Sequence, residues 1–259
     1  MVSVPLNDVA EYLDTFLRTA EVPDYAGALN GLQVENTAPI TRIAVAVDAS
    51  VQTIEGAADS GANLLVVHHG LFWSGAQPLR GNIYRRFQRL IASDLAVYSS
   101  HLPLDLHPTV GNNTLLARAF GLVPNGGFGL YKNVHVGVMG VADVDTATLV
   151  KRASAIAGAE RGAVVAVGVH EGSRTRRWAI CSGAGASSDS LREAAASDID
   201  TLIVGEGPHH TAVEAMELGI AVLYVGHYAT ETFGVMALGE ELERRFQLPW
   251  SFIAAPTGL

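Results

Sequence analysis

Two stretches of this sequence repeat the same order of apolar runs and polar residues, and this repetition constrains the fold more than any other feature. Residues 62–70 (ANLLVVHHG) align with residues 199–207 (IDTLIVGEG), and residues 95–101 (LAVYSSH) align with residues 221–227 (AVLYVGH). A duplicated supersecondary unit of about 65 residues accounts for the match. The alternative is the general self-similarity of α/β chains.

The two copies also share a spacing of chemically active residues. His101 is followed four residues later by Asp105, and His227 is followed four residues later by Glu231. General patterning of α/β chains does not explain a repeated His-x-x-x-acid segment. We therefore infer that two copies of one unit face each other around one site.

Short apolar runs alternate with amphipathic stretches in both copies. In the first copy the pattern predicts strand 42–47, helix 50–61, strand 64–67, helix 83–93 and strand 95–98. In the second copy it predicts strand 177–181, helix 188–197, strand 201–204, helix 211–218 and strand 220–225. Such alternation indicates an α/β fold with parallel or mixed sheets. We expect two topologically similar lobes around one site.

A glycine-rich break at 124–129 (PNGGFG) separates the copies. Beyond it, a strand at 135–141, a helix at 147–157 and a strand at 163–169 extend the second lobe. The expected boundaries are a first lobe over 1–125, completed by 226–259, and a second lobe over 126–225.

Composition limits the partners that such a chain can have. The formal net charge of −9 makes nucleic-acid binding unlikely, and we interpret the cluster of Arg85, Arg86 and Arg89 as a solvated face. Residues 1–13 are patterned as a polar helix and not as a signal peptide, and no apolar run is long enough to span a membrane. The single cysteine, Cys181, excludes an internal disulfide, so we expect a cytoplasmic protein.

Three segments at predicted strand ends carry metal-type residues. They are His68-His69-Gly70, His101 to Asp105, and His227 to Glu231. Both neighbouring imidazoles of the first segment can serve one site only where the strand ends, and Gly70 permits a turn there. A helix that begins near His227 places its imidazole and the Glu231 carboxylate on one face.

These donors exceed the needs of one tetrahedral ion and suit two divalent ions such as Zn, Fe or Mn. The remaining histidines that we considered have no such pattern and are interpreted as core or surface residues: His107, His135, His170 and His209.

A second candidate site is an anion-binding loop. Gly183, Gly185 and Ser187 follow a predicted strand and precede a predicted helix, where backbone N–H groups can bind a substrate anion. The alternative is a tight turn whose helix is capped by Ser190 and Glu193.

The motifs together resemble the Nif-three-like dinuclear metal-centre proteins, often called GTP cyclohydrolase I type 2 homologues. In family order they are NGLQV at 30–34, VVHHG at 66–70, HLPLD at 101–105, GNN at 111–113, GE at 205–206 and GHYATE at 226–231. The resemblance implies two intertwined, topologically similar α/β lobes around a central dinuclear metal site, assembled into a homohexamer. It also implies metal ligation by five residues. His69, Asp105 and Glu231 would bind one ion, and His68, His227 and the bridging Glu231 the other. His101 would lie beside the site as a further ligand or proton carrier, while no role is assigned to Asn30, Gln33, Glu206 or His210.

The leading hypothesis is a dinuclear metal-dependent hydrolase that acts on an anionic small molecule such as a nucleotide. A metal-bridging hydroxide would attack, with His101 or Glu231 as the catalytic proton acceptor. The reaction would be ring opening or phosphoester hydrolysis. The alternatives are a metal chaperone or insertion factor, and a hexameric interaction scaffold without catalysis.

Overall fold

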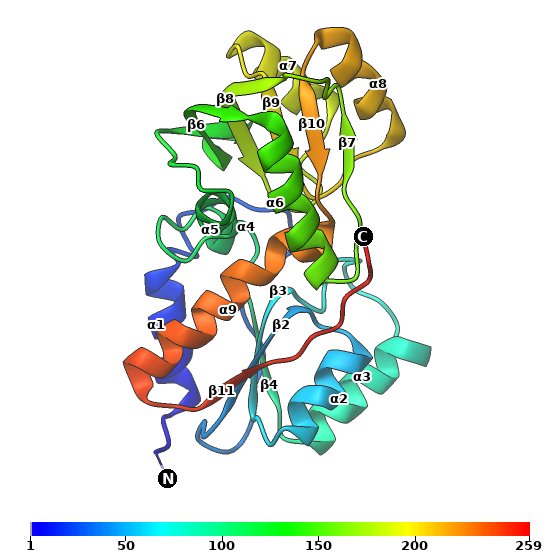
Figure 1. Cartoon of the computed structure of the whole chain (residues 1–259). Coiled ribbons are helices and arrows are strands. Elements are labelled where there is room, and N and C mark those ends of the chain that lie inside the picture. Colours follow the sequence, from blue (N-terminus) through cyan, green and yellow to red (C-terminus); the bar gives the residue numbers. More distant parts are fainter. Residues whose placement is uncertain (1) are drawn as a thin grey trace. The chain divides into compact units, whose positions relative to one another are not determined.

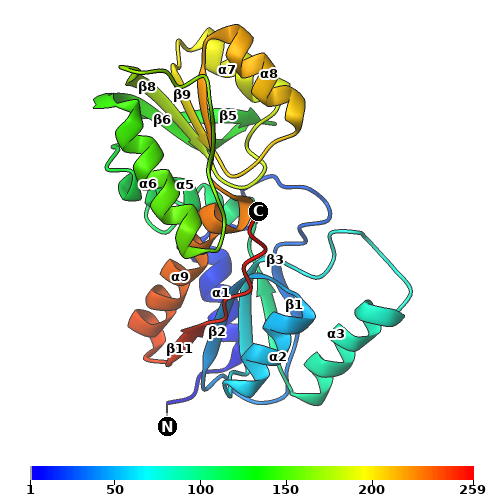
Figure 2. The ribbon, with the colours of Figure 1, turned by 45° about the vertical axis from the view of Figure 1, so that its right-hand side comes forward.

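The structure is a computed structural model that describes residues 2–259, and it contains two mixed α/β units, each built on one sheet (Figures 1 and 2). Unit 1 takes in the chain up to Leu104 together with Gly234–Ala255. Unit 2 takes in Asp105–Phe233 and Pro256–Leu259. None of the helices within residues 2–259 has the length and apolar character needed to cross a membrane.

Unit 1 has a five-stranded sheet in the order β1-β4-β3-β2-β11. The strands are β1 Gly31–Val34, β2 Ile43–Asp48, β3 Leu64–His69, β4 Ala96–Ser99 and β11 Trp250–Phe252. Neighbouring strands from β11 through β2 and β3 to β4 pair in parallel, and β1 is antiparallel to β4. The helices are α1 Leu6–Phe16, α2 Val51–Asp59, α3 Gly81–Ala92 and the single turn α4 Leu102–Asp105, whose last residue belongs to unit 2.

The ends of α2 follow directly from local sequence. Ser50 caps its N-terminus in a capping box with Thr53, in which each side chain accepts a hydrogen bond from the other residue's backbone N–H. Gly61, with a φ of +76°, takes the left-handed conformation just beyond the last turn. The helix predicted over 50–61 is therefore confirmed within this range.

Unit 2 has a six-stranded sheet in the order β5-β6-β8-β9-β10-β7. The strands are β5 Gly126–Tyr131, β6 Val134–Asp145, β7 Val165–Val167, β8 Arg174–Cys181, β9 Thr201–Val204 and β10 Ala221–Tyr224. The helices are α5 Asn112–Ala119, α6 Thr146–Ala159, α7 Ser188–Ala196, α8 His209–Leu218 and α9 His227–Phe246, and the chain passes from unit 2 to unit 1 within α9. β8, β9 and β10 are parallel, whereas β5, β6 and β7 pair antiparallel.

The predicted duplication is visible in the order and pairing of the elements. β2-α2-β3-α3-β4 in unit 1 corresponds to β8-α7-β9-α8-β10 in unit 2. In each unit the three strands pair in sequence order and in parallel. The α/β class with two similar lobes is therefore confirmed.

The glycine-rich segment at 124–129 is a strand and not a break, so this prediction is wrong. β5 pairs antiparallel with β6 over most of that segment. A Cβ atom on Gly127 would lie 2.7 Å from the Cβ of His135, so glycine is needed for close packing of the two strands. A glycine-rich sequence is typical both of a turn and of a strand that packs closely against its neighbour, so the sequence alone does not distinguish the two here.

The first unit also ends earlier than the expected residue 125. Leu116 and Phe120, in and just after α5, are fully buried in one core cluster with Trp178 of β8. This apolar contact places α5 in unit 2. At the other end of the chain, Leu259 accepts a hydrogen bond from the Tyr228 amide, so the final residues also belong to unit 2.

The remaining differences concern short elements. The pattern missed β1, α4, α5 and β11, each of eight residues or fewer. The expected helix over 1–13 is found as α1 at Leu6–Phe16, and Met1 lies outside the described residues.

Replacing Phe120 tests the assignment of α5 to the core of unit 2. Phe120→Ala should lower the free energy of unfolding by about 3–5 kcal/mol, because it removes a fully buried ring and leaves a cavity. Val123→Ala, at a side chain that is 79% exposed, should change it by less than about 0.5 kcal/mol. Urea denaturation followed by circular dichroism measures both, and equal effects would contradict the assignment.

Candidate metal centre

Three histidines of unit 1 form a cluster at the carboxyl ends of β3 and β4. The ring centroids of His68 and His69 are 4.7 Å apart, and those of His68 and His101 are 4.9 Å apart. One ring nitrogen from each lies within 4.8 Å of the others, a spacing that could hold a metal ion. We call these three residues the histidine cluster.

The strand runs further than the sequence predicted. β3 continues through His69, which pairs with Asp48 of β2, whereas the prediction ended the strand before the histidines. His68 is fully buried and His69 is partly exposed, as expected for neighbours on opposite faces of a strand. Their rings nevertheless lie close together, because the strand ends at His69.

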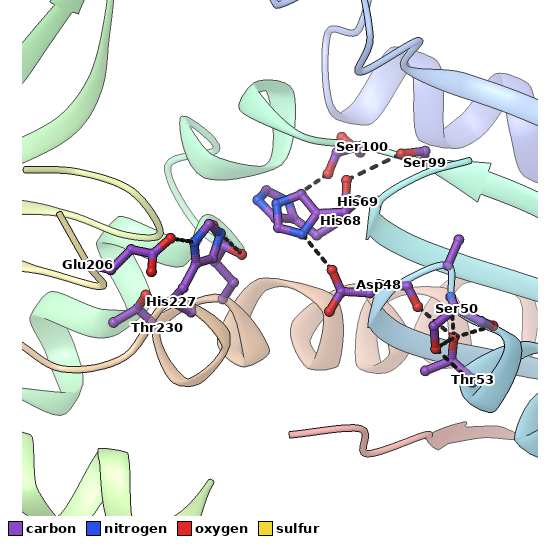
Figure 3. A network of polar contacts seen from close by, with 12 residues as sticks. Asp48, Ser50, Thr53, His68, His69, Ser99, Ser100, Glu206, His227 and Thr230 are labelled. Atoms are coloured by element: carbon purple, nitrogen blue, oxygen red, sulfur yellow. Dashed lines mark hydrogen bonds and ion pairs between the residues drawn. The ribbon is translucent and has the colours of Figure 1, made fainter. Parts of the chain in front are cut away.

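Each imidazole of the cluster is oriented through its Nδ1 atom. The three contacts are 2.9 Å long and join His68 to the Ser100 carbonyl oxygen, His69 to Asp48 Oδ1, and His101 to Asp24 Oδ1. Figure 3 shows the first two of them. A carbonyl oxygen only accepts hydrogen bonds, so the proton of His68 lies on Nδ1. The carboxylates favour the same tautomer in the other two rings, which leaves the lone pair on Nε2 in all three.

Asp24 is the residue that holds His101, and sequence reasoning missed it. Its Oδ2 accepts hydrogen bonds from Asn30 Nδ2 at 2.8 Å and from the Leu102 amide at 2.9 Å. Burial favours a raised pKa for Asp24, but His101, Asn30 and Leu102 outweigh it and hold the pKa below its usual value. Asn30 Oδ1 also accepts from the His101 amide, so the NGLQV motif contributes a clamp on His101.

Gln33 of the same motif contacts the chain just after His69. Its Oε1 accepts a hydrogen bond from the Leu71 amide at 2.7 Å, and its Nε2 donates to the carbonyl oxygens of Ala28 and Leu29. A Cβ atom on Gly70 would lie 2.3 Å from Gln33 Nε2. A side chain at position 70 would therefore displace the Gln33 amide from these contacts.

In unit 2, the first turn of α9 carries the second set of donors. The helix begins at His227, so the predicted i, i+4 arrangement with Glu231 is confirmed, and His227 Nε2 lies 3.1 Å from Glu231 Oε2. His227 Nδ1 lies 2.8 Å from Glu206 Oε1 (Figure 3). Burial alone lowers the pKa of His227, but Glu231 and Glu206 together raise it to about 9.

Asp105 is the other buried carboxylate of unit 2. It is 7% exposed, and its Oδ1 accepts hydrogen bonds from Asn112 Nδ2 at 2.8 Å and from Ser182 Oγ at 3.3 Å. Burial raises the pKa of the Cys181 thiol to about 12, and the charges of Asp105 and Glu231 contribute to the rise. Both carboxylates therefore act on the carboxyl end of β8.

The loop between β8 and α7 encloses the Glu231 carboxylate. Gly183 has a φ of +60°, and a Cβ atom there would lie 2.1 Å from Glu231 Oε1 and 3.2 Å from His227 Nε2. Only glycine leaves room at this point for both side chains and for anything bound to them.

The same loop does not offer its amides to an anion. The amide of Gly183 donates to Thr230 Oγ1, that of Gly185 to the Gly183 carbonyl, and that of Ser187 to Ser190 Oγ. The predicted anion site on Gly183, Gly185 and Ser187 therefore lacks structural support. The helix cap is also corrected, because the capping box pairs Ser187 with Ser190.

The histidines that we set aside lie elsewhere. His107 accepts a hydrogen bond on Nδ1 from the Val110 amide, which stabilises the turn before α5. The other side chains are exposed: His135, His170, His209 and His210.

The fold defines a mixed α/β protein with two units, each built around parallel central strands. The ends of these strands carry histidines and carboxylates that could hold a metal ion. Residues 4–257 match the family Duf34/NIF3 (NGG1p interacting factor 3). The chain belongs to this family.

Relatives and solved structures agree with this assignment. A Deinococcus radiodurans protein named "GTP cyclohydrolase 1 type 2 homolog" is 40% identical over 258 residues, covering 98% of this chain and 94% of the relative. A solved structure described as protein ybgI, of unknown function, is 32% identical with a TM-score of 0.88 and covers 100% of both chains. That of TTHA1606 from Thermus thermophilus is 34% identical with a TM-score of 0.82, covering 99% of this chain and 100% of that one.

The protonation of His227 can be measured directly. In metal-free protein, histidine NMR should give a pKa of about 9 for His227, and Glu231→Gln should lower it because one of the two charged partners is lost. A raised pKa stabilises the fold below pH 6.5, and this contribution is lost as the pH rises through about 9. A His227 pKa at or below 6.5 in the metal-free protein would contradict the described contacts.

Proposed function

We propose that this protein holds two divalent metal ions, with ligands from the histidine cluster and from the buried groups of unit 2, and that it uses them to hydrolyse an anionic small molecule. The proposed ligands are His68, His69, Asp105, His227 and Glu231. The proposed proton-transfer residues are His101 and Glu231. Zn, Fe and Mn are all compatible with imidazole and carboxylate donors.

The observation that carries this proposal is the common orientation of four histidines. His68, His69, His101 and His227 each place Nδ1 within 2.8–2.9 Å of a carbonyl or carboxylate oxygen. Metal-ligating histidines are characteristically held in this way, because the second hydrogen bond orients the ring and makes Nε2 more basic. A set of four supports a metal role far better than one such contact would.

The buried carboxylates also fit a cation. Glu231 is 2% exposed and Asp105 is 7% exposed, and burial of such charges is costly unless positive charge compensates them. His227 provides part of that charge while it is protonated, since its pKa is raised to about 9. Bound divalent ions would replace that proton and provide more charge.

When bound, the two metal ions would supply Lewis acidity and would lower the pKa of a bound water. The chain itself contributes orientation and proton transfer. Asp24 fixes the His101 ring through Nδ1, so His101 Nε2 is the atom placed to accept or return a proton. Asn30 holds Asp24, and through it the ring, in that position.

The substrate class and the assembly come from the relatives and the resemblance. The name "GTP cyclohydrolase 1 type 2 homolog" of the relatives supports a nucleotide substrate, either by ring opening or by phosphoester hydrolysis. We also propose a homohexamer located in the cytoplasm. Light scattering after size exclusion would measure the assembly.

Metal content is the first test. Elemental mass spectrometry of protein purified without a chelator should give close to two transition-metal ions per chain, because the donor set exceeds the needs of one ion. Glu231→Ala should lose most of this metal. His107→Ala, at a histidine that accepts a hydrogen bond in the turn before α5, should keep it. A value near zero in the wild type that reloading cannot raise would refute the metal centre.

Catalysis is tested separately through Asp24. Asp24→Asn should lower kcat by about 10- to 100-fold on a substrate found in a panel of nucleotides and phosphoesters, because His101 loses its charged partner. Metal content should stay at the wild-type level. Asp59→Asn, at an exposed acid that pairs with Arg89, is the matched control and should leave kcat unchanged. A metal-loaded wild type without turnover on the whole panel would favour a metal carrier over a hydrolase.

A further inference from the structure

Unit 1 contains a cavity that begins at the histidine cluster. It has a volume of about 760 Å³, which lies in the range of about 300–1,000 Å³ typical of small-molecule sites. Its walls are the first turn of α2, the loop from β3 to α3, and one face of α3. Figure 2 shows this long loop leaving β3 and leading into α3.

One part of the cavity is suited to an anion. Among the described residues that line it, Arg86 carries the one cationic side chain. Its guanidinium donates a hydrogen bond to the Ala49 carbonyl oxygen at 3.3 Å, which places it beside the start of α2. Val51 and Gln52 also line the cavity, and as the first residues of the helix their amide N–H groups have no acceptor within it. A guanidinium next to such amides is a strong combination for a phosphate or carboxylate.

Another part of the cavity is suited to a planar ring. Phe72 and Phe87 line it with ring centroids 6.1 Å apart, and Trp73 lines it with 37% of its surface exposed. Half-exposed aromatic rings around a cavity gain contact area when a flat apolar group is placed against them. The wall therefore offers stacking partners at a distance from the charged end.

Trp73 connects this wall to the proposed metal centre. Its ring lies edge-on to His69 at 5.7 Å between centroids and edge-on to His101 at 4.8 Å. A ring placed against Trp73 thus lies beside two residues of the histidine cluster. Asp48 is the carboxylate among the lining residues, and it is occupied by the hydrogen bond to His69 Nδ1.

We infer that this cavity is the substrate subsite and that it takes an organic anion with a planar aromatic ring. The anionic group binds to Arg86 and the first amides of α2, and the ring lies against Trp73. The inference rests on the proposed function only in calling the bound molecule a substrate. In this orientation the ring end of the molecule is the end that reacts, since it lies next to His69 and His101.

The assignment changes two interpretations of the sequence. Arg86 was grouped with Arg85 and Arg89 as a solvated face, yet it is half-buried in the cavity wall. The anion site moves from the glycine loop before α7 to the corresponding position before α2, the equivalent helix of the other copy.

Binding of three probes separates the two parts of the subsite. A nucleoside monophosphate should bind the full-length protein more tightly than its nucleoside or inorganic phosphate alone, as measured by calorimetry with and without metal. Arg86→Gln should weaken the monophosphate by about 10- to 100-fold and leave the nucleoside unchanged. Arg89→Gln, on the same helix but paired with Asp59, is the control and should match the wild type.

Tryptophan fluorescence tests whether the ring of the bound molecule lies against Trp73, and Trp250→Phe serves as the control for a tryptophan replacement as such. The monophosphate should quench the wild type and Trp250→Phe, but this quenching should be largely absent in Trp73→Phe. Equal affinity of Arg86→Gln and Arg89→Gln, or no binding of the monophosphate to the wild type, would overturn the subsite.

Metal content keeps this test separate from the proposed function. If the protein holds metal and turns over a substrate while the Arg86 and Arg89 variants bind alike, the subsite is wrong and the metal centre stands. If the probes bind in the expected order to a protein that never holds metal, the subsite stands and the hydrolase proposal fails.

Discussion

Parallel pairing of neighbouring strands is the interaction on which the candidate site depends in each unit. In unit 1, Val67 of β3 pairs with Ser99 of β4, so His68 and Ser100 follow at the same edge of the sheet. In unit 2, the parallel pairing of β8, β9 and β10 brings the Gly183 loop, Glu206 and His227 to one edge in the same way. Strand ends are where open α/β sheets place their ligands, because side chains there leave the ladder and can converge.

Convergence alone does not fix how the imidazole rings are oriented. The hydrogen-bond partners of the histidines do so. Asp24, Asp48, Ser100 and Glu206 each hold one imidazole by Nδ1. These oxygens are placed by backbone and side-chain contacts of their own, as Asn30 shows for Asp24. The result is a set of rings with a fixed tautomer, which lowers the reorganisation needed when an ion binds.

The cavity beside His69 has a charged end and an aromatic end. Its cation lies beside the start of α2, while its aromatic wall reaches Trp73 and through it the histidine cluster. In the proposed subsite, the bound molecule would turn its ring, and not its charged group, toward the histidine cluster. The duplicated architecture thus provides two similar strand-end frameworks, and the loop from β3 to α3 adds this cavity to unit 1.

The sequence by itself determined the α/β class, the duplication, the main strands and helices, and the six histidine and carboxylate candidates, because periodicity and short spacings are local properties. Local spacing also predicted that a helix beginning near His227 would carry Glu231 on the same face one turn later, and α9 begins at His227. Only the tertiary structure decided that Asp24 holds His101, 77 positions away, and that Gly127 packs on His135 within a sheet. It also decided that Arg86 faces a cavity and that the amides of the Gly183 loop are occupied. The contact of Asp24 with His101 joins residues far apart in the chain, and in none of these cases does a local pattern of residue types encode which residues meet.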